Sequence, residues 1–156
     1  MLKQRLLDPD LMKANLEVST KEEVLKTLAN ILFLNKYVKE SYYDAVLERE
    51  KLFPTGLPTE NIGVAIPHAS ENHAIKPGIA IAVLKKPVKF NVMGDLNTEI
   101  DIKVVFMIAI TNPDDQIKLL QDLIGLVQNE EFLLNISNCK DVDSMRIITE
   151  KYVSNE

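Results

Sequence analysis

Apolar residues recur at intervals of three and four positions in several parts of the chain, which is the spacing of one buried helix face. Residues 24–32 give the clearest case and predict a helix that runs to about Asn35. Ser19 and Thr20 are each followed three residues later by a glutamate, so two overlapping capping boxes mark its start. Three more helices are predicted, from about Glu40 to Lys51, from Pro113 through Val127 with Asn112 as its cap, and from Asp141 to about Tyr152.

Shorter apolar runs that are rich in β-branched residues predict strands. The run Ile62–Ile66 stops at Pro67, so this strand is expected to deliver His68 at its exposed end. Gly78–Leu84 predicts another strand, and Val88–Phe90 a third that pairs with it. Ile102–Ile110 is apolar almost throughout, which is the pattern of a central strand covered on both faces.

The alternation of strands and helices predicts an α/β fold, with a central mixed sheet flanked by helices on both faces. A length of 156 residues fits one domain, which we expect to span residues 1–156. Apolar residues make up 46% of the sequence and charged residues 26%, the balance of a globular protein.

Charge and cysteine content narrow the setting of the protein. The net charge of -5 disfavours nucleic acid as a partner, because the overall field repels phosphate. The single cysteine, Cys139, suits a reducing compartment. The apolar stretch Val104–Ile110 is far shorter than the roughly 20 residues that span a bilayer, and charge and proline interrupt the amino terminus before a signal peptide develops. We therefore expect a cytoplasmic protein without direct membrane insertion.

Only two histidines are present, which focuses the search for chemistry on His68 and His73. A neutral imidazole is a nucleophile near pH 7, and it suits a reversible phosphoryl relay. Such a relay needs positive charge or N–H donors around the phosphate oxygens. The backbone amides of Ala69 and Ser70 and the Ser70 hydroxyl are candidates for these donors. Spacing alone does not separate this role of His68 from that of a surface histidine without chemistry.

A guanidinium is the best single clamp for phosphate oxygens. Of the three arginines, Arg49 is the one followed by a turn that leads to the strand ending at His68. By spacing alone, the commoner alternative is a helix-end cation that pairs with Glu48 or Glu50.

Residues 48–57 and 62–68 closely resemble the Arg-Glu-x-x-x-Pro-Thr and Ala-x-Pro-His signatures of the fructose/mannitol-type enzyme IIA family of the bacterial sugar phosphotransferase system. The resemblance covers nearly the whole chain and implies the type-2 enzyme IIA fold and a protein-to-protein phosphotransferase without a cofactor. It implies that His68 accepts a phosphoryl group from the histidine phosphocarrier protein and passes it to a cysteine of enzyme IIB, with the membrane enzyme IIC involved only indirectly. It also implies that Arg49 assists at the phosphate, with Thr55 of the motif in support, and that the ring nitrogen remote from the main chain is phosphorylated.

Other segments resemble the galactitol-specific members most: residues 53–56, the pair His68 and His73, residues 112–120 and the ending Lys151-Tyr152-Val153. Mannitol-type members carry a second active-site histidine where Gln116 stands, and glutamine can donate a hydrogen bond but adds no charge. His73 does not replace that histidine by alignment, and a loop histidine without a catalytic part is the commoner interpretation. The expected role is therefore uptake of galactitol or a related hexitol or fructose.

Three alternative interpretations differ in what they require of the sequence. A nitrogen-type regulatory relative would use the same phosphohistidine to switch the binding of partner proteins. A small hydrolase with His68 as general base lacks a nucleophile and an orienting acid in the sequence. A metal site is not expected, because His68 and His73 stand five apart with no cysteine or third histidine nearby.

Overall fold

The structure is a computed structural model that describes residues 8–153. Its strands are β1 (Met12–Leu16), β2 (Gly56–Leu57), β3 (Val64–Ala65), β4 (Gly78–Val92) and β5 (Asp95–Ala109). Its helices are α2 (Lys21–Leu34), α3 (Tyr42–Leu52), α4 (Pro113–Val127), α5 (Glu130–Ser137) and α6 (Val142–Val153). Two short 3₁₀ turns, η1 (Pro9–Leu11) and η2 (Glu71–His73), complete the chain order.

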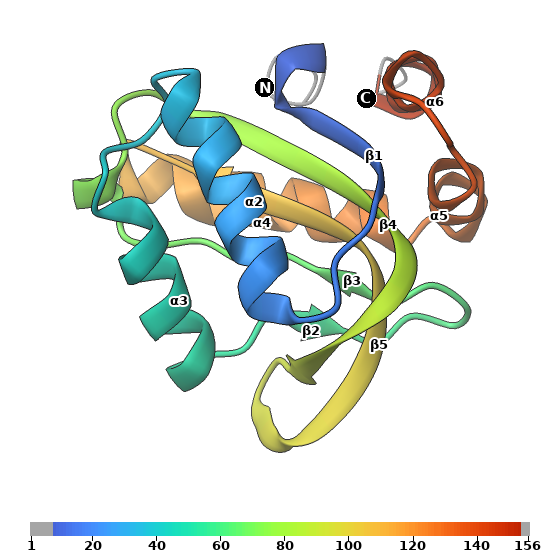
Figure 1. Ribbon diagram of the computed structural model, residues 1–156, viewed down its shortest axis with the longest axis horizontal. Helices are drawn as coiled ribbons and strands as arrows, with labels where there is room; N and C mark the ends of the chain where they lie inside the picture. Colours follow the sequence, from blue (N-terminus) through green and yellow to red (C-terminus); the bar gives the residue numbers. More distant parts are fainter. Residues whose placement is uncertain (1–7, 154–156) are drawn as a thin grey trace.

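The five strands form one mixed sheet around the long antiparallel pair β4 and β5. Strand β1 lies parallel to β4 on one side, and β3 lies parallel to β5 on the other. The short β2 pairs antiparallel with β3, and its Gly56 also meets Val92 at the far end of β4. Beyond the body of the sheet, β4 and β5 extend as a curved two-stranded arm (Figure 1).

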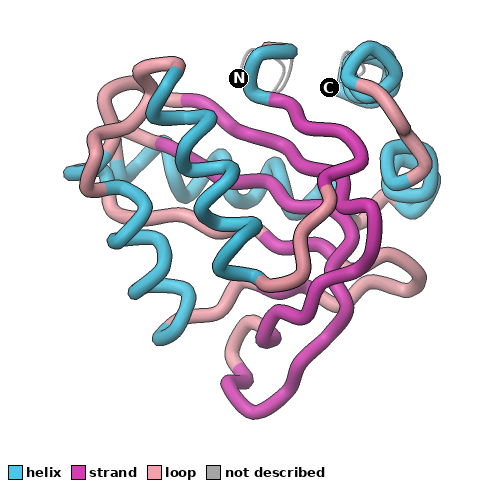
Figure 2. Tube along the Cα trace, in the orientation of Figure 1, coloured by secondary structure: helices cyan, strands magenta, loops and turns pink. Residues whose placement is uncertain are grey.

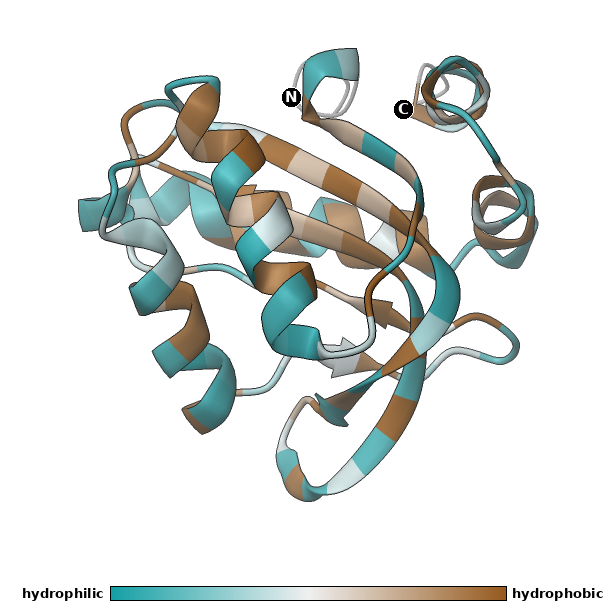
Figure 3. Ribbon diagram, in the orientation of Figure 1, coloured by the Kyte–Doolittle hydropathy of each residue, from teal (hydrophilic) through white to brown (hydrophobic). Residues whose placement is uncertain are grey.

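Helices cover both faces of the sheet (Figure 2). On one face, α2 and α3 pack against every second residue of the central strands, including Ala80, Ala82 and Val105. On the other face, α4, α5 and α6 pack against the residues between them, including Ile81, Val104 and Phe106. Hydrophobic residues colour much of the central strands brown in Figure 3, and on the helices brown alternates with teal. The predicted sheet flanked by helices on both faces is confirmed.

Three of the four predicted helix starts are confirmed at the level of individual hydrogen bonds, and α3 begins without a side-chain cap. The Thr20 hydroxyl oxygen accepts a bond from the Glu23 amide at 3.2 Å, and the Asn112 side chain accepts one from the Asp114 amide at 2.9 Å. Asp141 accepts a bond from the Ser144 amide at 2.7 Å. These side chains satisfy amides that have no partner in a first helical turn.

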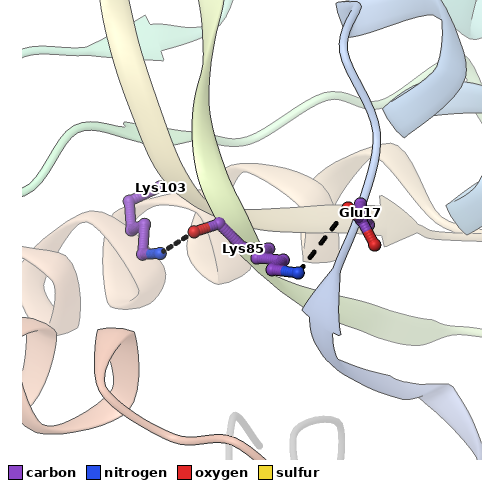
Figure 4. A network of polar contacts seen from close by, with 3 residues as sticks. All are labelled: Glu17, Lys85 and Lys103. Carbon is purple, nitrogen blue, oxygen red and sulfur yellow. Dashed lines mark hydrogen bonds and ion pairs between the residues drawn. The ribbon is translucent and has the colours of Figure 1, made fainter.

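The prediction that Val88–Phe90 is a separate strand paired with Gly78–Leu84 is wrong, because both belong to the single strand β4. The pairing of β4 with β5 shifts register between Val83 and Val88, a bulge that accommodates Pro87. Lys103 stabilises this bulge from β5 by donating hydrogen bonds to the carbonyl oxygens of Leu84 and Lys85. Figure 4 shows the Lys103 and Lys85 contact and the ion pair of 3.6 Å between Lys85 and Glu17.

Strands β1 and β2 and helix α5 were not predicted, and the strand predicted over Ile62–Ile66 is reduced to β3. Within residues 8–153, no helix is both long enough and apolar enough to span a membrane.

Candidate functional site

His68 stands three residues after β3 and is held against the carboxyl-terminal half of β5. The Ile108 amide donates a hydrogen bond to the Pro67 carbonyl oxygen at 3.0 Å, and His68 forms an isolated parallel bridge with Ile108. The chain segment that leads to His68 is therefore held by backbone pairing with the sheet and is not an unpaired loop. This pairing gives the His68 side chain a defined position.

The ring of His68 is more covered than predicted, because only 8% of the residue is exposed. Its Nδ1 lies 2.9 Å from the Ile66 carbonyl oxygen. A carbonyl oxygen only accepts hydrogen bonds, so this contact places a proton on Nδ1 and leaves the lone pair of the neutral ring on Nε2. Across residues 8–153, the buried side-chain polar atoms without a partner are Glu130 Oε2 and Thr149 Oγ1. Among the described residues His68 Nε2 forms no hydrogen bond, and it is not one of these fully buried atoms, so part of its surface is in contact with solvent.

Burial lowers the pKa of His68 below its ordinary value of 6.5, because the surroundings disfavour the charged ring. The positive charge of Arg49 lowers this pKa further, while the hydrogen bond to Ile66 opposes both effects. The imidazole is therefore neutral at pH 7, with Nε2 available as a nucleophile.

Arg49 lies in the last turn of α3, where its charge is favourable at the carboxyl end of the helix dipole. Its guanidinium carbon stands 5.4 Å from the centre of the Phe53 ring. In the described part of the chain, the ion pairs within 4.0 Å join Lys85 with Glu17, Lys89 with Asp101, and Arg146 with Glu150. Arg49 forms none of them, so the ion pair with Glu48 or Glu50 that spacing favoured is absent. The guanidinium is exposed and close enough to His68 to act on its charge.

Thr55 joins the end of α3 to the segment that carries His68. Its amide and its hydroxyl both donate hydrogen bonds to Glu50 Oε1, at 3.0 and 2.7 Å. Its carbonyl oxygen accepts a bond from the Ile66 amide at 3.4 Å. Sequence reasoning missed the role of Glu50, which is only 4% exposed. The signal was present in the Arg-Glu-x-x-x-Pro-Thr motif, where Glu50 was interpreted only as a possible partner of Arg49.

The remaining predicted residues differ in their burial and in their contacts. Ala69 is buried directly after His68, whereas Ser70 is exposed and its carbonyl oxygen accepts a bond from the His73 amide at 3.2 Å. His73 faces the start of α3, where its Nδ1 lies 2.8 Å from the Ser41 hydroxyl oxygen. Gln116 is half-buried in the first turns of α4, and its backbone amide donates a hydrogen bond to the Asn112 carbonyl oxygen at 3.2 Å. Within the described residues, none of these contacts joins His73 or Gln116 to His68.

Comparison with known proteins places this site in context. The family described as "Phosphoenolpyruvate-dependent sugar phosphotransferase system, EIIA 2" matches residues 5–151. The galactitol-specific EIIA component of Escherichia coli (strain K12) is 27% identical over 142 residues, which cover 91% of this chain and 93% of that protein. The mannitol-specific enzyme IIA component of Bacillus subtilis (strain 168) is 29% identical over 144 residues, covering 90% of this chain and 94% of that protein.

The fold is also found in a solved complex of enzyme IIAMTL with phosphorylated enzyme IIBMTL from Escherichia coli. The matched chain is 22% identical and superimposes with a TM-score of 0.76, covering 96% of this chain and 98% of that one. The predicted type-2 enzyme IIA fold is confirmed by this likeness.

Proposed function

We propose that His68 is the phosphoryl-carrying residue of this chain, which belongs to the EIIA 2 family of the phosphoenolpyruvate-dependent sugar phosphotransferase system. As a member of that family, the chain is a phosphotransferase that moves phosphoryl groups between proteins. The observation that carries the proposal is the His68 ring itself, which is neutral, protonated on Nδ1 and open at Nε2.

The proposed reaction has two steps. In the first, the Nε2 lone pair attacks the phosphorus of a phosphohistidine on the donor, so a new N–P bond forms as the donor's N–P bond breaks. The proton on Nδ1 stays in place, held by the Ile66 carbonyl oxygen. In the second, a thiolate of the acceptor attacks the same phosphorus, an S–P bond forms, and Nε2 recovers its lone pair.

Arg49 supports both steps through charge. The phosphoryl oxygens carry negative charge in the transition state, and the Arg49 guanidinium, which forms no ion pair within 4.0 Å among the described residues, can bind them. Ala69, Ser70, Thr55, Gln116 and His73 are proposed as supporting residues around the phosphate or its carriers.

The proposed donor is the histidine phosphocarrier protein and the proposed acceptor is the cysteine of enzyme IIB. The acceptor is supported by the solved complex of a similar fold with phosphorylated enzyme IIB. Galactitol is the proposed sugar of the system, because a galactitol-specific EIIA component matches nearly the full length of the chain. The mannitol-specific relative has a similar identity, so a related hexitol is the second candidate.

Incubation with phosphoenolpyruvate, enzyme I and the histidine phosphocarrier protein tests the proposal. Wild-type protein is expected to gain one acid-labile, alkali-stable phosphoryl group, and His68→Ala is expected to gain none. His73→Ala is the control for the position of the label, because it keeps His68 and is therefore expected still to gain one phosphoryl group at completion, whatever its rate. Equal labelling of His68→Ala would overturn the site. Transfer to galactitol enzyme IIB supports transport, whereas phosphate-dependent binding of another protein without such transfer would indicate the regulatory function instead.

A further inference from the structure

A continuous series of hydrogen bonds runs from the Glu50 carboxylate to the ring of His68. Glu50 accepts two bonds from Thr55, one from its amide and one from its hydroxyl. The Thr55 carbonyl oxygen accepts from the Ile66 amide at 3.4 Å, and the Ile66 carbonyl oxygen lies 2.9 Å from His68 Nδ1. Thr55 and Ile66 are each held through both their amide and their carbonyl group, so the series connects the Glu50 carboxylate with the imidazole.

The same carboxylate also fixes the end of the helix that carries Arg49. Glu50 is the next residue along α3, and the Phe53 amide donates to the Arg49 carbonyl oxygen at 2.7 Å as the helix ends. The bonds to Thr55 then fold residues 53–55 back toward Glu50. Phe53, whose ring stands beneath the Arg49 guanidinium, is part of this turn. Glu50 is thereby connected both to the end of the helix that carries Arg49 and to the segment that carries His68.

We propose that Glu50 is a positioning residue for phosphoryl transfer: through Thr55, its carboxylate sets the placement of the His68 ring relative to the Arg49 guanidinium. This inference rests on the proposed function of His68, which it deepens. A buried carboxylate with 4% exposure is retained here because it accepts bonds from both polar groups of Thr55. Small displacements of reacting groups slow a transfer reaction strongly, so a change in the placement of His68 relative to Arg49 is expected to lower the transfer rate.

The charge state of Glu50 adds a dependence on pH to this arrangement. The charged groups that act on it are Lys21 from α2 and Arg49 from α3, and both favour the carboxylate, as do the bonds from Thr55. Burial outweighs them and raises the pKa of Glu50 to about 7. Protonation therefore weakens the acceptor at the start of the hydrogen-bond series within the neutral pH range.

The test compares transfer rates from the phosphorylated histidine phosphocarrier protein at pH 6 and pH 8. Glu50→Gln is expected to lower kcat about tenfold at pH 8 with KM within about twofold. At pH 6 the difference is expected to shrink below about threefold, because the wild-type carboxyl then also carries a proton. Thr55→Val is expected to lower kcat, and Thr55→Ser to restore it, because serine keeps the hydroxyl and the amide. Glu48→Gln, an exposed charge on the same helix, is the matched control and is expected to match wild type.

Two results would overturn the proposal. One is a Glu50→Gln protein that transfers as fast as wild type at pH 8. The other is an equal loss at both pH values that follows a loss of thermal stability, which indicates a structural role only. If Glu50→Gln does not fold, NMR of the His68 ring nitrogens in unphosphorylated wild type tests the proposal instead. An inflection of their chemical shifts near pH 7 supports the coupling between Glu50 and His68, and the absence of that inflection rejects it. Because this titration needs no phosphate, it remains decisive even if wild-type His68 fails to label, a result that would reject the proposed function itself.

Discussion

The hydroxyl of Tyr42 donates a hydrogen bond to the backbone carbonyl oxygen of Ile108, the β5 residue that bridges to His68. Tyr42 opens α3 and Glu50 lies near its end, so the helix is tied to the site at two levels. Burial raises the pKa of Tyr42 well above its ordinary value, which keeps the hydroxyl protonated as a donor. Helix α3 is thus the element that brings Arg49 and His68 together.

Removing this hydroxyl is expected to reduce stability. Tyr42→Phe leaves the buried Ile108 carbonyl oxygen without its side-chain donor, and we expect the free energy of unfolding to fall by about 1–2 kcal/mol. Urea denaturation measures this difference. Tyr43→Phe removes a hydroxyl from a half-buried neighbour on the same helix and is the control. Equal stability of Tyr42→Phe and Tyr43→Phe would show that the Ile108 bond does not hold the helix.

Arg49 is expected to matter for rate and not for folding. The side chain is exposed and forms no ion pair in the described structure, so Arg49→Gln should change the free energy of unfolding by less than about 0.5 kcal/mol. Loss of its charge beside the phosphoryl group should slow transfer about a hundredfold. Rapid-quench kinetics provide the rate. Lys51→Gln removes an exposed charge from the same last turn and is expected to transfer normally; if it slows transfer as much as Arg49→Gln, general charge and not a clamp is responsible.

The dependence of stability on pH should separate wild type from Glu50→Gln. Burial raises the pKa of Glu50 from 4.5 to about 7 in the folded protein. The contribution of Glu50 to the free energy of unfolding is therefore complete below pH 4.5 and is lost as pH rises through 7. Between pH 5 and pH 8, the free energy of unfolding of wild type is therefore expected to fall by about 2 kcal/mol relative to that of Glu50→Gln. The lowered pKa of His68 acts in the opposite direction, with stability lost as pH falls below 6.5, but both proteins share this effect. Denaturation at the two pH values gives the difference, and a constant gap would contradict the raised pKa.

Two glycines with different surroundings provide a further pair of stability measurements. A Cβ at Gly125, in the exposed last turn of α4, would meet nothing within 4 Å, so Gly125→Ala is expected to stabilise by about 0.5–1 kcal/mol. A Cβ at Gly63 would collide with the Asp101 carbonyl oxygen on β5. Gly63→Ala is expected to destabilise by about 2 kcal/mol or more, because backbone atoms must move. Thermal unfolding ranks the variants, and the reverse order would show that the strand packing beside His68 is misplaced.

Strongly periodic segments were predictable because local signals and tertiary packing agree there. The capping side chains of Thr20 and Asn112 form the bonds that their sequence positions indicate. Strand β1 was missed because Lys13 and Asn15 interrupt its apolar pattern, and Asn15 has a φ of 51°. Continuity of β4 was missed because Lys85-Lys86-Pro87 is typical of a turn, while Lys103 from β5 stabilises the bulge that carries the strand through it.

Some features of the site were predictable from the local sequence, and others depend on long-range packing. The motif pointed to His68 and Arg49, and the structure brings them within electrostatic reach. The depth of His68 and the hydrogen bonds of Glu50 were not predictable, because both depend on how α3 packs against β3 and β5. A glutamate near the end of a helix is usually solvated, and only the turn at Pro54 and Thr55 closes over this one.

The central claim is that Nε2 of His68 takes the phosphoryl group while the proton remains on Nδ1. One measurement tests it directly: the phosphorus–nitrogen coupling of phosphorylated protein that carries isotope-labelled histidine. The structure predicts a one-bond coupling to Nε2 of His68, with Nδ1 still bearing its proton toward the Ile66 carbonyl oxygen. A coupling to Nδ1, or a coupling to His73, would contradict the account.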